Sequence, residues 1–152
     1  MGNGYSWGNH MTKESSAYDK PVPIPLHEDL SKPFWEATKR HELIMPKCNS
    51  CSSIFFYPRE ACPECTSMDL SWTKVSGKGR VYSYTHVRQS VHPSFQSANG
   101  HIYAIVELAE GPKIPSNILE CEPENVQVDM NVVATFEDID EDYTLLKFKP
   151  AS

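Results

Sequence analysis

Long apolar runs are missing from this chain of 152 residues. No window approaches the roughly 18 consecutive apolar residues of a membrane-spanning helix, and the first residues lack the basic start and apolar stretch of a secretion signal. Basic side chains are also scarce, with 14 Lys and Arg against 20 Asp and Glu and a formal net charge of −6. That balance argues against sequence-independent nucleic-acid binding, which depends on clustered Lys and Arg. We therefore expect a cytoplasmic protein with one domain and room for a small appended module.

Catalytic sequence motifs are missing as well. The chain has no Gly-x-Ser-x-Gly, no phosphate-binding Gly-Lys-Ser/Thr loop and no His-Glu-x-x-His. Catalytic partners can meet in the fold without being neighbours in sequence, so enzymatic activity stays open, although we expect no catalytic residue. Cys121 follows Ile118-Leu119-Glu120, which predicts a partly buried strand residue and not a nucleophile. The candidates for chemistry are His27, His41, His86, His92, His101 and Cys121. His92 and His101, which border a long loop, would be tested first.

Four of the five cysteines form two Cys-x-x-Cys pairs, Cys48 with Cys51 and Cys62 with Cys65. Each pair places two thiolates on one tight turn, and two such turns complete the tetrahedral sulfur set that zinc prefers. Two redox dithiols or two disulfides are weaker alternatives, because neither a thioredoxin-like context nor an export signal is present. An iron–sulfur centre is the remaining chemical alternative. Because four cysteines leave no position for a reactive water, the pattern predicts one structural zinc ion.

The first 44 residues divide into three segments by composition. Residues 1–10 are rich in Gly and Asn and resemble a vector-derived leader, so we leave them out of the fold. Residues 11–27 contain proline at alternate positions near their end, which predicts an extended arm. Residues 28–44 place large apolar side chains at helical spacing, and Ser31, two residues before Pro33, is a candidate N-cap. This segment is predicted to be a short amphipathic helix.

Beyond the helix the sequence predicts a ribbon over residues 45–71 and a barrel over residues 72–150. Residues 52–61 are aromatic and are expected to form a small hairpin over the metal, whose binding should supply much of the folding free energy. Residues 137–142 are acidic and fit a solvated hairpin tip better than a calcium loop, because they lack the EF-hand rhythm. Residues 89–100 are expected to form a long loop between strands. Five or six short strands are expected in the barrel, and the candidate segments are 72–76, 80–88, 101–109, 115–121, 131–138 and 144–149.

With this order established, the chain resembles the zinc-ribbon OB-fold family, formerly grouped as a domain of unknown function. The resemblance covers about residues 28–150 and implies a mainly β fold, with a short N-terminal helix, a rubredoxin-like four-cysteine ribbon and a C-terminal OB-fold β-barrel. Ser52 departs from the family, in which glycine often follows the first cysteine pair, so a turn with positive φ would be mildly strained there. The motifs that carry the resemblance are Phe34-Trp35-Glu36-Ala37, the two cysteine pairs, Tyr57-Pro58-Arg59, Ser76-Gly77-Lys78-Gly79-Arg80-Val81-Tyr82-Ser83 and Val106-Glu107-Leu108-Ala109-Glu110-Gly111-Pro112.

The resemblance implies a non-catalytic accessory subunit that supports a thiolase-like partner acting on acyl-CoA, by thiolysis, acyl transfer or carbon–carbon cleavage. Residues 39–88 carry eight Lys and Arg against four acids, a balance of +4 that suits the phosphates of coenzyme A. Lys74, Lys78, Arg80 and Arg88 are the candidate contacts to coenzyme A. Leu30, Phe34 and Trp35 are the candidate contacts to the partner subunit, because buried aromatic anchors are common at interfaces.

Two other functions compete with the accessory role. An OB-fold barrel can bind single-stranded nucleic acid by stacking bases on Tyr82, Tyr84 and Tyr103, although the acidic balance counts against it. A free-standing zinc-dependent enzyme would require an open metal position, which a site made of four cysteines does not provide.

Overall fold

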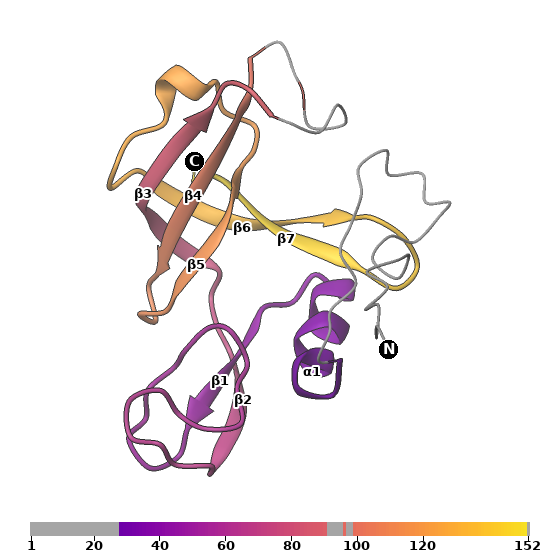
Figure 1. The fold of residues 1–152 in the computed structure, drawn as a ribbon, viewed down its shortest axis with the longest axis vertical. Helices are drawn as coiled ribbons and strands as arrows, with labels where there is room; N and C mark the ends of the chain where they lie inside the picture. The colour runs from indigo at the N-terminus through magenta and orange to yellow at the C-terminus, as the bar shows by residue number, and fades with distance from the viewer. Residues whose placement is uncertain (1–27, 91–95, 97–98, 152) are drawn as a thin grey trace, which may run out of the picture.

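The computed structural model describes residues 28–90, 96 and 99–151, and these form a helix, a two-stranded ribbon and a five-stranded barrel (Figure 1). The predicted leader and arm, His27 and His92 lie outside the described residues, and the loop at 89–100 is described only in part. The elements are α1 (Glu28–Lys39), β1 (Ile44–Cys48), β2 (Leu70–Lys74), β3 (Lys78–Val87), β4 (His101–Leu108), β5 (Lys113–Ile118), the short helix η2 (Pro123–Asn125), β6 (Asn131–Asp138) and β7 (Thr144–Pro150).

Helix α1 is shorter than predicted, because it ends at Lys39 and not near residue 44. His41 has a φ of 56°, the left-handed conformation that closes a helix. The His41 amide donates to the Thr38 carbonyl and the Glu42 amide donates to the Ala37 carbonyl, which together form a Schellman motif. Glycine is common at this position, so without one the end of the helix could not be recognised from the sequence.

The predicted N-cap role of Ser31 is wrong. The helix begins at Glu28, so Ser31 and Pro33 both lie inside it, and Ser31 is fully buried. Among the residues that the structure describes, no helix has the length and apolar character needed to cross a membrane.

The barrel closes in the strand order β3-β4-β5-β7-β6, with β6 returning to pair with β3. All neighbouring pairs are antiparallel except β5 with β7, which are parallel. Gly79 lies where β3 meets β4, and a Cβ atom at this position would lie 2.5 Å from the Glu107 carbonyl oxygen. The close approach of two backbones therefore requires glycine here. The closed barrel confirms the mainly β fold and the OB-fold expectation.

Strand β3 differs from the regular alternation that its sequence indicates. A β-bulge interrupts its pairing with β4 between Val81 and Ser83. Val81 is fully buried, whereas Ser83 and Thr85, which strict alternation would place on the same face, are exposed. An extra residue in one strand moves every later side chain to the opposite face, and period-2 analysis has no signal for it.

One core joins α1, β1 and the barrel. Phe34 and Met45 contribute from the N-terminal side and pack with barrel residues such as Phe148, which is fully buried. A second, much smaller cluster lies in the ribbon and consists of Cys48, Phe55 and Cys62. The ribbon thus has almost no apolar core of its own, in contrast to the barrel.

Candidate metal centre

The two cysteine pairs occupy two turns of the same shape in the ribbon. In the first turn the Ser52 amide donates to the Cys48 carbonyl at 2.9 Å, and in the second the Thr66 amide donates to the Cys62 carbonyl at 2.9 Å. Ser52 and Thr66, the residues after each pair, both have a φ of 62°. The expected positive-φ turn at Ser52 is therefore present, and the second turn repeats it.

The four sulfur atoms are close enough to bind one metal ion. All four lie within 4.8 Å of one another, and the Sγ–Sγ distances are 3.5 Å for Cys48 with Cys65 and 3.6 Å for Cys51 with Cys62. A tetrahedral zinc ion with Zn–S bonds of about 2.3 Å requires sulfur atoms about 3.8 Å apart. The arrangement therefore fits a four-thiolate zinc ion, with Cys48 and Cys62 buried and Cys51 and Cys65 exposed.

The environment of the thiols favours a cation. Backbone hydrogen bonding from Cys51, with a smaller contribution from Ser50, lowers the pKa of Cys48 to about 6 despite its burial. The Ser53 backbone lowers the pKa of Cys51, but hydrogen bonds with neighbouring thiols, led by Cys65, outweigh this effect and raise it to about 12. Clustered thiolates repel one another, so complete deprotonation of the four groups requires a divalent ion to compensate their charge.

Polar contacts between the two turns support the sulfur cluster. The Ser50 and Ser67 hydroxyls lie 2.9 Å apart. The Asn49 side-chain amide donates to the Asp69 carboxylate at 2.8 Å and accepts a hydrogen bond from the Ser71 hydroxyl at 2.9 Å. These contacts orient the turns that carry the ligands, a role that residues around metal ligands commonly have.

The segment between the pairs is not the predicted hairpin strand. Only Ile54 forms a β-bridge, with Lys47, and the ribbon hairpin is made by β1 and β2 instead. Phe55 is buried beside the cysteines, and the Phe56 ring packs against the Phe34 ring with centroids 5.8 Å apart. The aromatic residues of this segment therefore connect the metal centre to the main core. This packing explains their large side chains, although the segment does not form a strand.

The four basic residues predicted to contact coenzyme A do not form one cluster. Lys74 lies in β2 and Lys78 begins β3, whereas Arg88 follows the other end of this ten-residue strand. Arg80 is engaged by Glu107 at 2.7 Å and by Asp129 at 2.6 Å. At about 3.3 Å per residue, opposite ends of β3 are too far apart to bind one phosphate.

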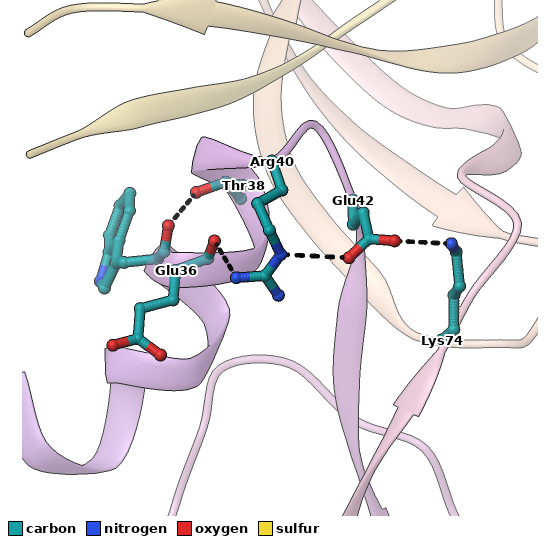
Figure 2. Close-up of polar contacts among 6 residues, drawn as sticks. Glu36, Thr38, Arg40, Glu42 and Lys74 are labelled. Atoms are coloured by element: carbon teal, nitrogen blue, oxygen red, sulfur yellow. Dashed lines mark hydrogen bonds and ion pairs between the residues drawn. The ribbon is translucent and has the colours of Figure 1, made fainter. Parts of the chain in front are cut away.

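Lys74 takes part in a chain of charged contacts at the end of α1 (Figure 2). Its ammonium lies 2.9 Å from the Glu42 carboxylate, which also contacts the Arg40 guanidinium at 3.4 Å. Hydrogen bonding from Lys74 is the main cause that lowers the pKa of Glu42. Arg40 in turn donates to the Glu36 carbonyl at 2.9 Å. The chain joins the helix end to β2, which gives Lys74 a structural contact within the protein.

The three residues predicted to bind a partner differ in exposure. Phe34 is 3% exposed, so its side chain belongs to the core and is unavailable to a partner. Trp35 is partly buried, and its ring packs edge-on against Tyr143 with centroids 5.7 Å apart. Leu30 is 37% exposed. The helical pattern marked Phe34 correctly as apolar but did not indicate whether the ribbon and barrel would cover it.

Within the described part of the chain, His41 and His86 each contact a residue outside the set of candidate catalytic residues. His41 lies 3.0 Å from Asp138, whose carboxylate also accepts a hydrogen bond from Thr144. The His86 ring nitrogen lies 2.6 Å from the Asn99 carbonyl oxygen. Cys121 is partly buried as predicted, but it follows β5 and does not lie in a strand. The partner of His41 was missed because 97 residues separate the pair in sequence.

The three tyrosines that would stack nucleic-acid bases do not share a face. Tyr84 pairs with the fully buried Ala104, so both side chains leave the sheet on the same side, although Tyr84 itself is 39% exposed. Tyr103 precedes Ala104 in β4 and therefore points outward. The Tyr82 ring is covered by the Lys113 ammonium, 4.1 Å from the ring centre. This arrangement lacks the continuous stacking surface of a single-strand binder.

A closed OB-fold barrel with a four-cysteine ribbon defines the class of zinc-ribbon OB-fold proteins. Residues 35–70 match the family described as "ChsH2, rubredoxin-like zinc ribbon domain", and residues 72–137 match "ChsH2, C-terminal OB-fold domain". The chain belongs to this ChsH2-like family, also designated DUF35.

Similar proteins come from several organisms. A "DUF35 domain-containing scaffold protein" of Methanocaldococcus jannaschii is 40% identical over 111 residues, covering 71% of this chain and 77% of the relative. A "Probable enoyl-CoA hydratase alpha subunit" of Thermomonospora curvata is 34% identical over 119 residues, covering 78% of this chain but only 37% of the relative.

One solved structure, "Ltp2-ChsH2(DUF35) aldolase", aligns with a TM-score of 0.75 and 30% identity, over 85% of this chain and 100% of the matched chain. A DUF35 structure from Sulfolobus solfataricus aligns with a TM-score of 0.58 and 20% identity, which supports the fold alone.

Proposed function

We propose that this chain is a non-catalytic zinc-containing subunit of an acyl-CoA-processing complex in the cytoplasm. The observation that carries the proposal is the alignment with a chain of the Ltp2-ChsH2 aldolase along that chain's whole length. The matched scaffold relatives support the same role. In this proposal the partner is a thiolase-like enzyme that performs thiolysis, acyl transfer or carbon–carbon cleavage on a CoA thioester.

The metal centre supports an accessory role for this chain. Four cysteine sulfurs complete a tetrahedral set, so a bound zinc ion would hold the two turns together and have no position for a substrate. The ion would supply folding free energy to the ribbon. The reacting groups would then come from the partner, and coenzyme A would bind at a site shared with it.

Leu30 is the best candidate for direct contact with the partner. It lies in the first turn of α1 and is 37% exposed, whereas Phe34 on the same helix is buried. If Leu30 anchors the partner, Leu30→Ala should weaken assembly by about 2 kcal/mol. Val128→Ala is a matched control, because Val128 is also apolar and is 56% exposed on the barrel.

The proposal is tested by co-expressing this chain with the product of its neighbouring gene, for which a thiolase-like enzyme is the expected identity. We expect a stable complex by size-exclusion chromatography with light scattering, and loss of turnover when this chain is omitted. Cys121→Ala and His101→Ala should leave turnover intact. Full activity of the partner alone would refute the accessory role, and loss of turnover in either variant within an assembled complex would show that this chain contributes a catalytic residue. Salt-sensitive retention of single-stranded oligonucleotides would favour nucleic-acid binding instead.

A further inference from the structure

Each exposed cysteine of the metal centre lies beside a buried cysteine from the other turn. The Sγ atom of the exposed Cys51 is 3.6 Å from that of the buried Cys62. The Sγ atom of the exposed Cys65 is 3.5 Å from that of the buried Cys48. We call these two contacts the crossed pairs, because each one joins the turn of the first Cys-x-x-Cys pair to the turn of the second.

This arrangement determines which sulfur atoms an oxidant in solution meets first. All four cysteines that hold a zinc ion do so as thiolates, and the thiolate is the form of cysteine that reacts with peroxides. Oxidation of thiolates follows their exposure, so Cys51 and Cys65 are expected to react before Cys48 and Cys62. Each oxidised sulfur then has a thiolate of the other turn next to it.

We propose that a hydroperoxide converts the metal centre into two disulfides along the crossed pairs and releases the zinc ion. The Cys51 thiolate attacks hydrogen peroxide, which leaves a sulfenic acid on Cys51 and releases hydroxide. The Cys62 thiolate then attacks the Cys51 sulfur, so that a disulfide forms and a second hydroxide leaves. Cys65 and Cys48 react in the same two steps.

The overall reaction balances for one zinc site. Two molecules of hydrogen peroxide and four protons become four molecules of water, while four thiolates are oxidised to two disulfides and one Zn²⁺ leaves. This inference rests on the predicted zinc site and does not depend on the accessory role in an acyl-CoA complex.

The geometry favours the crossed connectivity over a disulfide within one turn. The sulfur atoms of the crossed pairs need to approach only from 3.5 and 3.6 Å to a bond length of about 2.05 Å. A first disulfide between Cys51 and Cys62 uses one cysteine of each turn, and it leaves Cys48 and Cys65 beside each other for the second. A disulfide within one turn would leave both remaining thiolates on the other turn and the two turns unconnected.

The crossed disulfides should keep the ribbon folded after the zinc ion has left. The residues that they join are 17 and 11 positions apart in the sequence, and a cross-link over such a distance restricts the unfolded chain. The two bonds connect the same turns that the metal would connect. The Ser50 and Ser67 hydroxyls, 2.9 Å apart, would stay in contact. Removal of zinc by a chelator forms no such bonds, so oxidation and chelation should give different ribbons.

The sequence allows the connectivity to be read directly with trypsin. Cleavage after Lys47, Arg59 and Lys74 places the two Cys-x-x-Cys pairs on separate peptides, residues 48–59 and 60–74. The full chain, with its zinc content measured first, is treated with hydrogen peroxide, and its free thiols are then alkylated before denaturation and digestion. We expect the two peptides to be joined, with tandem mass spectrometry assigning both bonds to the crossed pairs.

Two further measurements follow the metal and the fold. A chromogenic chelator should detect release of one zinc per chain, and ¹H–¹⁵N spectra of the oxidised chain should keep dispersed peaks for residues 45–74. Treatment with a thiol reductant and zinc should restore the metal. The matched control is Cys121→Ala, which removes the fifth cysteine and should leave the connectivity and the zinc release unchanged.

Four results would overturn the proposal. Separate peptides that each contain an internal disulfide would show that oxidation stays within the turns. Loss of the ribbon peaks on oxidation would show that the new bonds do not replace the metal. A changed result in Cys121→Ala would assign the oxidation to another thiol, and absence of zinc before treatment would remove the site on which the proposal rests. The turnover of a partner enzyme is not measured, so failure of the accessory role would leave these results unaffected.

Discussion

The barrel buries a continuous set of aliphatic side chains and closes its own ladder of strands, whereas the separate buried cluster of the ribbon consists of three side chains, two of which are cysteines. Both regions are β structure of the same chain. Burial of apolar surface stabilises the barrel. The ribbon buries too little apolar surface to be stabilised in this way, so metal binding must supply the missing folding free energy. The ribbon and the barrel, on the two sides of Gly77, thus have similar backbone structure but are stabilised by different interactions.

The largest expected effect comes from removal of the metal. Cys48→Ser, or a strong chelator, should unfold the ribbon while the barrel stays folded, because structural zinc contributes apparent binding free energies of about 10–16 kcal/mol at neutral pH. Elemental analysis should find one zinc per chain before treatment, and ¹H–¹⁵N spectra should lose the dispersed peaks of residues 45–74 only. Retention of those peaks without metal would show that the ribbon folds by itself.

The next largest effect should come from the barrel core. Phe148 is fully buried, and Phe148→Ala should lower the free energy of unfolding by about 3–5 kcal/mol in urea titrations. Val128→Ala, at an exposed position, should change it by less than about 0.5 kcal/mol. A Phe148 variant as stable as the control would mean that the barrel does not depend on its core.

Substitution of Gly79, where two backbones approach closely, should reduce stability somewhat less. A Cβ atom there would meet the Glu107 carbonyl oxygen at 2.5 Å, so Gly79→Ala should destabilise the barrel by about 1–3 kcal/mol by forcing strands β3 and β4 apart. Gly111→Ala is the matched control, because nothing lies within 4 Å of its added Cβ, although its φ of 107° carries its own strain. Equal thermal midpoints for the two variants would contradict a steric origin.

Substitution in the ribbon turns should stabilise the metal centre. Ser52 and Thr66 have a φ of 62°, which costs non-glycine residues about 1–2 kcal/mol. Ser52→Gly should therefore slow zinc transfer to a competing chelator, and the double variant with Thr66→Gly should slow it further. Ser53→Gly, at a neighbouring position, is not expected to slow it.

The smallest effect concerns the contact between the helix end and the barrel. Hydrogen bonding from His41, followed by that from Thr144, lowers the pKa of Asp138. A lowered pKa in the folded state contributes stability above the ordinary pKa of the carboxyl group, and this stability is lost as pH falls through the lowered value. Asp138→Asn should thus reduce stability at pH 7 but not at pH 2, measured by urea unfolding. A constant difference at both pH values would exclude the charge as its source.

Local chemistry explains what could be predicted. The spacing of Cys48, Cys51, Cys62 and Cys65 indicated the site directly, because thiolate ligands and tight turns are properties of neighbouring residues. Strands β4, β6 and β7 lie within about two residues of the predicted segments, because alternation along a strand is also local. The acidic run at residues 137–142 covers the end of β6 and most of the turn to β7.

The sequence by itself determined the ligand set, the order of helix, ribbon and barrel, and most strand positions. Only the tertiary structure decided that Phe34 is core, that Arg80 is held by Glu107 and Asp129, and that Tyr84 and Tyr103 point to opposite faces. These outcomes depend on residues distant in sequence, such as His41 and Asp138, and on one bulge that reverses the faces of a strand. Whether a side chain is exposed, and which residue it contacts, depends on how the elements pack against one another. The sequence pattern within a single element does not contain this information.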